Sequence, residues 1–353
     1  MSLSYRPGVY SRYDVIRRRK NVSKNLAFFC GGAKLKVGKN IPAGTMVQLH
    51  SSQQLTEFFE PTGQGKMFYQ ICRILLEAGL ESVYAVPLTT DGSIPDTSLY
   101  EPAFRKLCGV KRSGVILCDS MEISVLTALS REISAASQNE KERIAVCAVL
   151  KAAAVEAANQ LNTERMVLCV QEGTIPFEEP SVFYTAAAMG AMIAEAEPDR
   201  NFHGEICEGL SDVSALSEEE VEELLKNGIT VFEQFQEKVQ CIRCVTTRTH
   251  TAGEADRTFS SINTILMIDD IIRSVRERLA QLIQGKTAAF SEDSIASQAA
   301  VILDEKLQQG YVTSFEPPVV YRQESDPSVC IIELEFDLAA VVSRIYLTAH
   351  IIV

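Results

Sequence analysis

The sequence predicts an α/β protein: an α/β sandwich-type body, a C-terminal α+β domain, and extended β-arms at both ends of the chain. Three observations lead to this class. Short continuous apolar runs alternate with helical segments, which is typical of parallel strands buried on both faces of a sheet. A long amphipathic helix and alternating strand patterns follow them. Both ends of the chain have the two-residue period of extended strands rather than a helical period.

The first half of the chain supplies most of the predicted sheet. Short apolar or alternating runs predict strands over 24–33, 44–52, 81–88, 113–120, 142–150 and 164–173. The segments between them have the three- and four-residue apolar spacing of amphipathic helices. These helices are predicted over 65–80, 121–137 and 151–162. The alternation predicts a mostly parallel sheet covered by helices.

Two further helices follow this alternation. Residues 181–197 form a run rich in alanine and other small residues that predicts a closely packed helix. Residues 217–228 predict a helix with defined ends: Ser217 is the N-cap, Glu220 completes a capping box, and Asn227-Gly228 ends the helix. Residues 229–250 then return to strands.

The last third of the chain predicts two helices and two strands. A helix over 259–286 carries an apolar stripe of Ile262, Ile265, Ile268, Ile272, Val275, Leu279 and Leu282. Ser291 caps a further helix that Gly310 closes. One predicted strand has on one face Cys330, Ile332, Leu334, Phe336 and Leu338. The last predicted strand has on one face Ile345, Leu347, Ala349, Ile351 and Val353. Because the two strands differ in parity, residues 339–343 must change the phase between them.

The charge of the chain is unevenly distributed. The net charge is −12, yet residues 1–40 carry ten basic residues and one acid, whereas residues 195–238 carry 13 acids and three bases. Such asymmetry can indicate a basic arm that binds nucleic acid. It can also indicate that the positive arm of one copy meets the negative body of another. The cluster Arg17, Arg18, Arg19 and Lys20 lacks interleaved aromatic residues, which favours the second interpretation.

Metal and redox chemistry find little support in the sequence. Most of the ten cysteines lie within apolar runs, and the single C-x-x-C pair, Cys241 and Cys244, has no second pair or nearby histidine set. The four histidines are scattered without ligand spacing. We therefore expect reduced structural thiols, no metal site and no cofactor.

The nucleotide and catalytic motifs are also incomplete. The segment 31–40 resembles a phosphate-binding loop, but Ala33 and Asn40 stand where glycine and Ser/Thr are needed. Asp119 follows a predicted sheet strand, where a catalytic acid often lies; capping of the next helix by Asp119 or Ser120 is the commoner explanation. The pair Asp269-Asp270 lies within a helix and is expected to be solvated. An α/β sheet without a site favours a structural protein.

The sequence predicts neither a signal peptide nor a membrane span. The basic cluster follows residue 16 and no apolar segment precedes it. The apolar runs are far shorter than the roughly 20 residues that a spanning helix needs. We therefore expect synthesis in a cytoplasm and no insertion into a membrane.

The order of the segments resembles the tail sheath proteins of contractile phage tails, bacteriocins and related injection systems. A "PGVY" arm precedes the α/β body, the run "AAAMGAMIAEAEPDRNFHGE" precedes "SEEEVEELLKNGI", and "VQCIRCVTTRT" and "INTILMIDDIIRSVRERL" follow. The resemblance extends from about residue 181 to the end of the chain and holds in outline for the first half. It departs at "AEPDRNFHGE", where many members of the family have a different turn.

The resemblance implies a structural subunit rather than an enzyme. Sheath subunits surround a tail tube in a helical lattice that shortens and drives the tube through a cell envelope. The implied partners are further copies of the chain, the tail tube protein, and baseplate and terminator proteins, with no nucleic acid. The subunit would be made in the bacterial cytoplasm and would become part of a virion tail or phage-like particle.

The resemblance also implies roles for particular residues. Strand exchange between subunits would use Val9, Tyr10, Tyr13 and Val15 of the N-terminal arm and Ile345, Leu347, Ala349, Ile351 and Val353 of the C-terminal arm. The cluster Arg17 to Lys20 would contact the acidic region of another subunit. In the family the tube-facing element lies in the C-terminal domain, which makes Arg273, Arg276 and Arg278 candidates here.

The predicted domains are an N-terminal arm (1–22), an α/β body (23–235), a C-terminal α+β domain (236–338) and a C-terminal strand arm (339–353). Two other interpretations stay open at this point. One is an α/β enzyme of unknown substrate, and the other is a nucleic-acid-binding protein with a basic arm.

Overall fold

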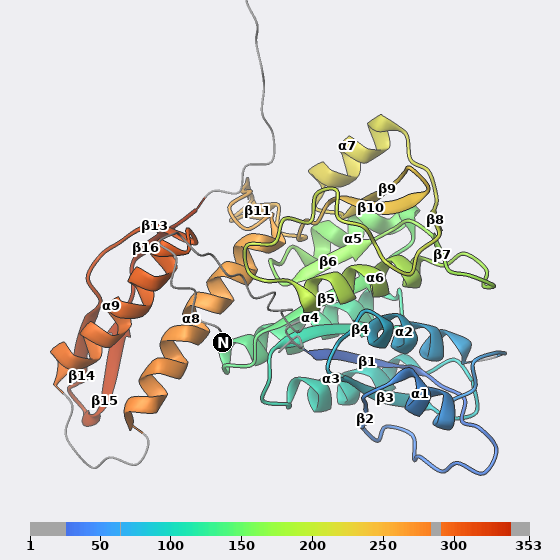
Figure 1. The fold of residues 1–353 in the computed structure, drawn as a ribbon, viewed down its shortest axis with the longest axis horizontal. Coiled ribbons are helices and arrows are strands. Elements are labelled where there is room, and N and C mark those ends of the chain that lie inside the picture. Colours follow the sequence, from blue (N-terminus) through green and yellow to red (C-terminus); the bar gives the residue numbers. More distant parts are fainter. Residues whose placement is uncertain (1–25, 64, 284–290, 340–353) are drawn as a thin grey trace, which may run out of the picture.

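A six-stranded sheet forms the centre of the body (Figure 1). The structure, a computed structural model, describes residues 26–63, 65–283 and 291–339. All neighbouring strands run parallel except β2, which is antiparallel to β3. In spatial order the strands are β2 (Val47–Leu49), β3 (Val83–Thr89), β1 (Leu26–Gly32), β4 (Gly114–Cys118), β5 (Arg143–Ala148) and β6 (Met166–Cys169). The predicted α/β class is thereby confirmed.

Helices cover both faces of this sheet. Along β1, Ala27 and Phe29 pack into one apolar cluster, whereas Leu26 and Phe28 pack into the other. The first face is covered by α1 (Ser52–Phe58), α2 (Lys66–Glu77) and α6 (Val182–Glu195). The second face is covered by α3 (Tyr100–Cys108), α4 (Ile123–Gln138) and α5 (Ala154–Leu161), with short 3-10 turns at Thr97–Leu99 and Lys151–Ala153. Because the strands are covered on both sides, their sequences are continuously apolar.

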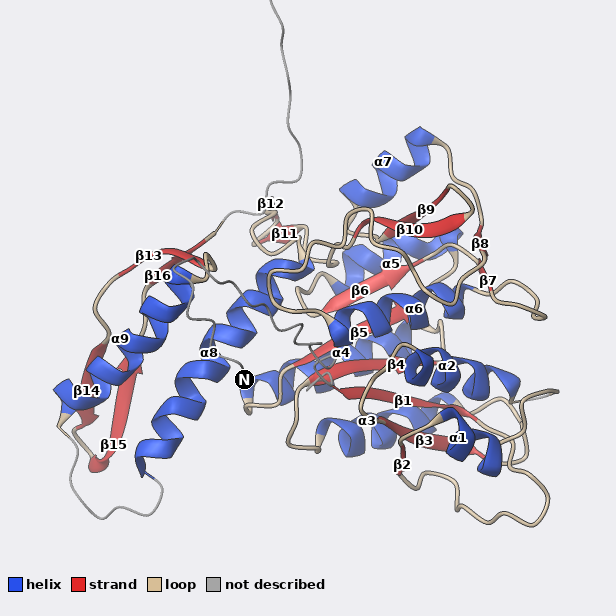
Figure 2. Cartoon of the chain, in the orientation of Figure 1, coloured by secondary structure: helices blue, strands red, loops and turns tan. Residues whose placement is uncertain are grey.

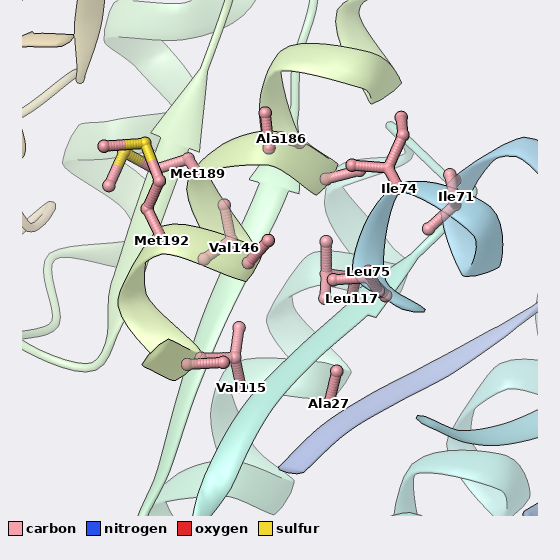
Figure 3. Close-up of a cluster of buried hydrophobic side chains, with 14 of the residues drawn as sticks. Ala27, Ile71, Ile74, Leu75, Val115, Leu117, Val146, Ala186, Met189 and Met192 are labelled. Carbon is pink, nitrogen blue, oxygen red and sulfur yellow. The ribbon is translucent and has the colours of Figure 1, made fainter. Parts of the chain in front are cut away.

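Helix α6 lies close to the sheet because its residues are small. A Cβ atom on Gly190 would lie 3.0 Å from a methyl carbon of Leu117, so a larger residue would push the helix away from β4. In Figure 3, Ala186, Met189 and Met192 of α6 lie over Val146, while Val115 and Leu117 lie beside them. The small-residue run predicted over 181–197 is therefore the helix that seals this face.

A group of short strands and one helix follows α6. The strands are β7 (Gly173–Thr174), β8 (Asp212–Val213), β9 (Val231–Phe235), β10 (Lys238–Arg243), β11 (His250–Thr251) and β12 (Glu254–Ala255). Between them lies α7 (Glu218–Lys226), whose N-terminus has the predicted capping box of Ser217 and Glu220. The domain boundary predicted after residue 235 falls in the turn that joins the antiparallel strands β9 and β10.

The C-terminal part forms a separate layer beside the body (Figure 2). It contains α8 (Ile262–Ile283), α9 (Glu292–Gln308), β13 (Val312–Phe315), β14 (Val319–Gln323), β15 (Asp326–Glu333) and β16 (Phe336–Leu338). A small apolar core joins Ile271 of α8 to Leu303 of α9 and Val312 of β13. β14 pairs with β15, and β13 pairs with β16, as two separate antiparallel sheets.

The strand predicted over 328–338 is interrupted in the structure. β15 ends at Glu333 and β16 begins at Phe336, so the segment changes its pairing partner at Leu334 and Glu335. Leu334, Phe336 and Leu338 nevertheless pack against the same small core, as their shared parity predicts. The two-residue pattern predicted the shared face of these three residues, but it contains no information about which strand each part of the segment pairs with.

Candidate functional site

Helix α8 is attached to the body through a buried ion pair. Arg165 precedes β6 at the amino edge of the parallel sheet, and its two terminal nitrogens donate to the two carboxylate oxygens of Asp269 at 2.9 and 2.7 Å. Desolvation raises the pKa of Asp269, and the hydrogen bonds from Arg165 oppose that rise. The expectation that Asp269 belongs to a solvated patch was wrong, because its side chain is 7% exposed.

Two further ion pairs hold α8 in place. Arg276 donates to Glu142, at the start of β5, at 2.7 Å. On the opposite side, Lys306 of α9 donates to Asp270 at 2.6 Å. Helix α8 therefore connects the amino edge of the sheet to the C-terminal layer, and both acids of the Asp269-Asp270 pair have a cationic partner.

The three candidate tube-facing arginines lie along α8 with different surroundings. Arg273 is half-buried and lines a crevice against the body with Glu142 and Asp269. Arg276 is bound to Glu142, and the exposed Arg278 donates to Gln298 of α9 at 2.8 Å. Contact with a tube stays a prediction for all three residues.

The predicted arm residues lie outside the described part of the chain. These are the strand-exchange residues of both arms and the basic cluster Arg17 to Lys20. Their roles stay predictions. In the described C-terminal layer, Val319 and Tyr321 of β14 and Val329 of β15 are exposed.

A buried carboxylate occupies the point where the strand order of the sheet reverses. In the sheet, β3 lies on one side of β1 and β4 lies on the other. Open α/β proteins commonly bind ligands at the carboxyl ends of the strands at such a point. Here Asp119 accepts hydrogen bonds from the Gly32 amide at 2.7 Å and from the Tyr100 hydroxyl at 2.6 Å. A Cβ atom on Gly31 would lie 2.5 Å from this carboxylate. The position is therefore filled by protein atoms.

This arrangement differs from the helix cap expected at Asp119 or Ser120. Helix α4 begins at Ile123 with Glu122 as its N-cap, and no side chain caps it. Ser120 accepts from the Glu122 amide at 3.2 Å, so it supports the turn that precedes the helix. Burial raises the pKa of Asp119, and the Tyr100 and Gly32 hydrogen bonds oppose that rise.

Helix α7 presents the acidic surface expected from the charge distribution. Glu218, Glu219, Glu222 and Glu223 are exposed. Glu220 differs from these four residues: its carboxylate pairs with Lys151 at 2.5 Å and completes the capping box with Ser217. The four exposed carboxylates are not held by any salt bridge within the described residues, so this face is free to attract cations.

The thiols and histidines form no metal site in the described residues. Cys241 and Cys244 are free and buried, and burial raises the pKa of both thiols. No group of three or more His, Cys, Asp or Glu side chains within the described ranges could hold a metal ion. Within the same ranges, every helix is too short or too polar to cross a lipid bilayer.

Comparison with known proteins gives matches at the level of structure. No protein-family model matches the sequence, and no curated protein matches it. The helical sheath of the anti-feeding prophage in its contracted state is similar at a TM-score of 0.72 and 16% identity, covering 99% of each chain. The sheath of an extracellular contractile injection system in its contracted state is similar at 0.67 and 11% identity, covering 99% of this chain and 98% of that one.

The structure of this chain is also similar to the crystal structure of a sheath tail protein from Listeria innocua. Its TM-score is 0.69 at 12% identity, with 90% of this chain and 93% of that one covered. The chain therefore has the fold of contractile tail sheath proteins, over both the body and the C-terminal layer.

Proposed function

We propose that this chain is the structural subunit of a contractile tail sheath. It polymerises helically around a tail tube, and the lattice contracts to drive the tube through a cell envelope. The observation that carries the proposal is the match over 99% of both chains to a subunit of a helical sheath, with no large insertion on either side. The partners are further copies of the chain, the tail tube protein, and baseplate and terminator proteins.

The C-terminal layer supports a role in strand exchange. In the described residues β14 and β15 form a sheet of only two strands, and several of their apolar side chains are exposed. A two-stranded sheet is marginal on its own in water, and an open strand edge recruits strands from other chains. The arms 1–22 and 339–353 of neighbouring copies are the proposed additional strands. A head-to-tail contact of this kind builds a helical filament when the rotation between copies does not close into a ring.

The acidic face of α7 supports an electrostatic contact between copies. The exposed glutamates Glu218, Glu219, Glu222 and Glu223 are the proposed partners of Arg17, Arg18, Arg19 and Lys20 of a neighbour. Charge complementarity of this kind sets the register and the rate of association more than the final affinity.

The strand order of the sheet reverses at Asp119, and the filling of this position by protein atoms argues against an α/β enzyme. An enzyme of this strand order needs an open crevice beside the carboxyl ends of β1 and β4. Asp119 closes that position by accepting hydrogen bonds from the Gly32 amide and the Tyr100 hydroxyl. The nucleic-acid interpretation depends on the basic arm alone, and the acidic α7 provides that arm with a protein partner.

Sedimentation of the purified chain over a range of concentrations tests the proposal. A sheath subunit is expected to pass from monomers to very large particles as the concentration increases. The same chain lacking residues 339–353 is the control and is expected to stay monomeric. A wild-type chain that stays a monomer or forms a small closed oligomer at every concentration would contradict the proposal.

A further inference from the structure

A crevice at the amino edge of the sheet is lined by more basic than acidic side chains. It has a volume of about 500 Å³ and lies between α8 and the two connections that lead into β4 and β5. We call it the amino-edge crevice. The basic residues that line it are Lys111, Arg112, Lys141, Arg273 and Arg276. The acidic residues that line it are Glu140, Glu142 and Glu277.

Three of these basic side chains have no partner within the part of the chain that the structure describes. Lys111, Lys141 and Arg273 form no side-chain salt bridge or hydrogen bond there. The carboxylate of Glu142 already accepts from Arg276 at 2.7 Å. The Nε atom of Arg273 is buried and has no acceptor among the described atoms. Because a buried donor without an acceptor is costly, a further carboxylate in the crevice would stabilise this guanidinium.

The chain from the basic arm enters the sheet beside this crevice. Leu26 is the first residue of β1 and pairs with Gly114 of β4. Gly114 directly follows Ser113, which lines the crevice. In the sequence, Lys20 of the basic cluster is six residues before Leu26. The crevice and the point where the arm joins the body therefore lie at the same edge of the sheet.

The acidic face of α7 lies at the opposite edge. We call it the acidic ridge, and its residues are Glu218, Glu219, Glu222 and Glu223. Within the same helix, Glu220 pairs with Lys151, which follows the carboxyl end of β5. The crevice residue Glu142 precedes the amino end of β5. The six residues of this strand separate the two edges by roughly 20 Å. In Figure 1, α7 projects outward from the body. The acidic ridge therefore does not reach the crevice of its own copy.

We propose that the amino-edge crevice binds the acidic ridge of a second copy of this chain. The inference rests on the proposed function and deepens it, because it names a surface of the body that receives α7 in addition to the basic arm. Charge complementarity supports this occupant: within the described residues, the ridge has four carboxylates without a salt bridge and the crevice has three such cations. Because the two surfaces differ and lie at opposite edges, the contact is head-to-tail and can repeat from copy to copy.

The first test reverses the charge of the two lysines in the crevice. Lys111→Glu with Lys141→Glu places like charges opposite the acidic ridge, so the concentration for half-maximal assembly in low salt should rise about tenfold or more. Lys34→Glu with Lys36→Glu is the matched control, because each pair has one exposed and one half-buried lysine. Lys34 and Lys36 follow the carboxyl end of β1, away from the crevice. The control should assemble as the wild type does, and both variants should unfold at the wild-type temperature. Equal assembly by the two variants would overturn the inference.

The second test identifies the occupant in the wild-type chain with a carbodiimide, which joins a lysine amine to a carboxylate in direct contact. Assembled particles should yield peptides in which Lys111 or Lys141 is joined to a glutamate of the acidic ridge. Dilute monomers should yield none. Particles grown from a mixture of unlabelled and isotope-labelled chains should contain linked pairs of mixed mass, which shows that the link joins two copies.

The outcomes of this crosslinking separate the inference from the proposed function. Links from Lys111 and Lys141 only to a tube or baseplate protein, or only within one chain, would overturn the inference. If the wild-type chain never assembles, the proposed function fails. If it assembles but neither lysine is joined to the acidic ridge of a second copy, only this inference fails.

Discussion

Arg165 and Asp269 join the two layers of the molecule across 104 residues of sequence. The guanidinium lies at the amino edge of the parallel sheet and the carboxylate lies on α8, with two hydrogen bonds of 2.9 and 2.7 Å between them. Their side chains are only 15% and 7% exposed. A buried pair with this geometry fixes the orientation of α8 relative to the body, so the C-terminal layer and the body should move as one unit.

Removal of one member of this pair should strongly destabilise the subunit. Asp269→Asn leaves the Arg165 guanidinium buried without a counter-charge, which typically costs about 3–5 kcal/mol. The free energy of unfolding, measured in urea, should fall by that amount. Glu81→Gln is the matched control, because it removes a carboxylate bound to Arg112 at 2.7 Å at the surface, and its effect should be small. Equal effects of the two substitutions would show that the Arg165–Asp269 pair does not hold the layers together.

Asp119 should make the subunit less stable as the pH rises. Burial raises its pKa above the ordinary value of 3.8, so the folded chain keeps a proton that the unfolded chain releases. The contribution of Asp119 to the free energy of unfolding is therefore fully present below pH 3.8 and is lost as the pH rises through the raised pKa. Asp119→Asn retains an acceptor for the Gly32 amide and offers a donor to Tyr100, so it should remove this pH dependence. Thermal unfolding of both proteins between pH 4 and 8 measures the difference.

The stability of the Asp119→Asn variant relative to the wild type tests the direction of this pH dependence. At pH 8 the Asp119→Asn variant should be at least as stable as the wild type, because no carboxylate has to ionise in the buried site. If the variant is less stable at every pH, Asp119 is stabilised as an anion by Gly32 and Tyr100, and the predicted sign is wrong.

Removal of residues 345–353 should separate folding from assembly. These residues carry the apolar face of Ile345, Leu347, Ile351 and Val353, which we predict joins a sheet of the next subunit. The truncated chain should have the unfolding temperature of the wild type but should not polymerise. Hydrogen exchange gives an independent measurement: in dilute wild-type monomer this segment should exchange rapidly. Slow exchange there would mean that the segment belongs to the fold of its own subunit.

Charge reversal tests the contact between the basic arm and α7. Changing Arg17, Arg18 and Arg19 to Glu places like charges opposite the exposed glutamates of a neighbouring α7, so assembly should be blocked or require high salt. Reversing Glu218, Glu219 and Glu222 to Lys in the same chain should restore assembly. Assembly that is unchanged in low and high salt, measured by light scattering, would exclude this contact.

The local features of the fold were predictable from the sequence. Continuous apolar runs predicted β4, β5 and β6, because strands covered on both faces need no alternation. The capping box at Ser217 and Glu220 predicted the start of α7, because both of its hydrogen bonds lie within four residues. Leu334, Phe336 and Leu338 were predicted on one face and pack against one core, but the change of pairing partner at Leu334 was not predicted.

The long-range polar contacts were not predictable in the same way. Asp269 has no feature that separates it from a solvated helix residue, because its partner Arg165 lies in a different part of the sequence. The same holds for Asp119, whose partners are Gly32 and Tyr100.

Electron microscopy of the concentrated, purified chain tests the central claim most directly. A sheath subunit is expected to form hollow helical tubes whose reconstruction places α8 on the inner wall. Images that contain only single particles, or closed rings that never stack, at concentrations where the protein remains folded, would contradict the assignment of this chain as a contractile sheath subunit.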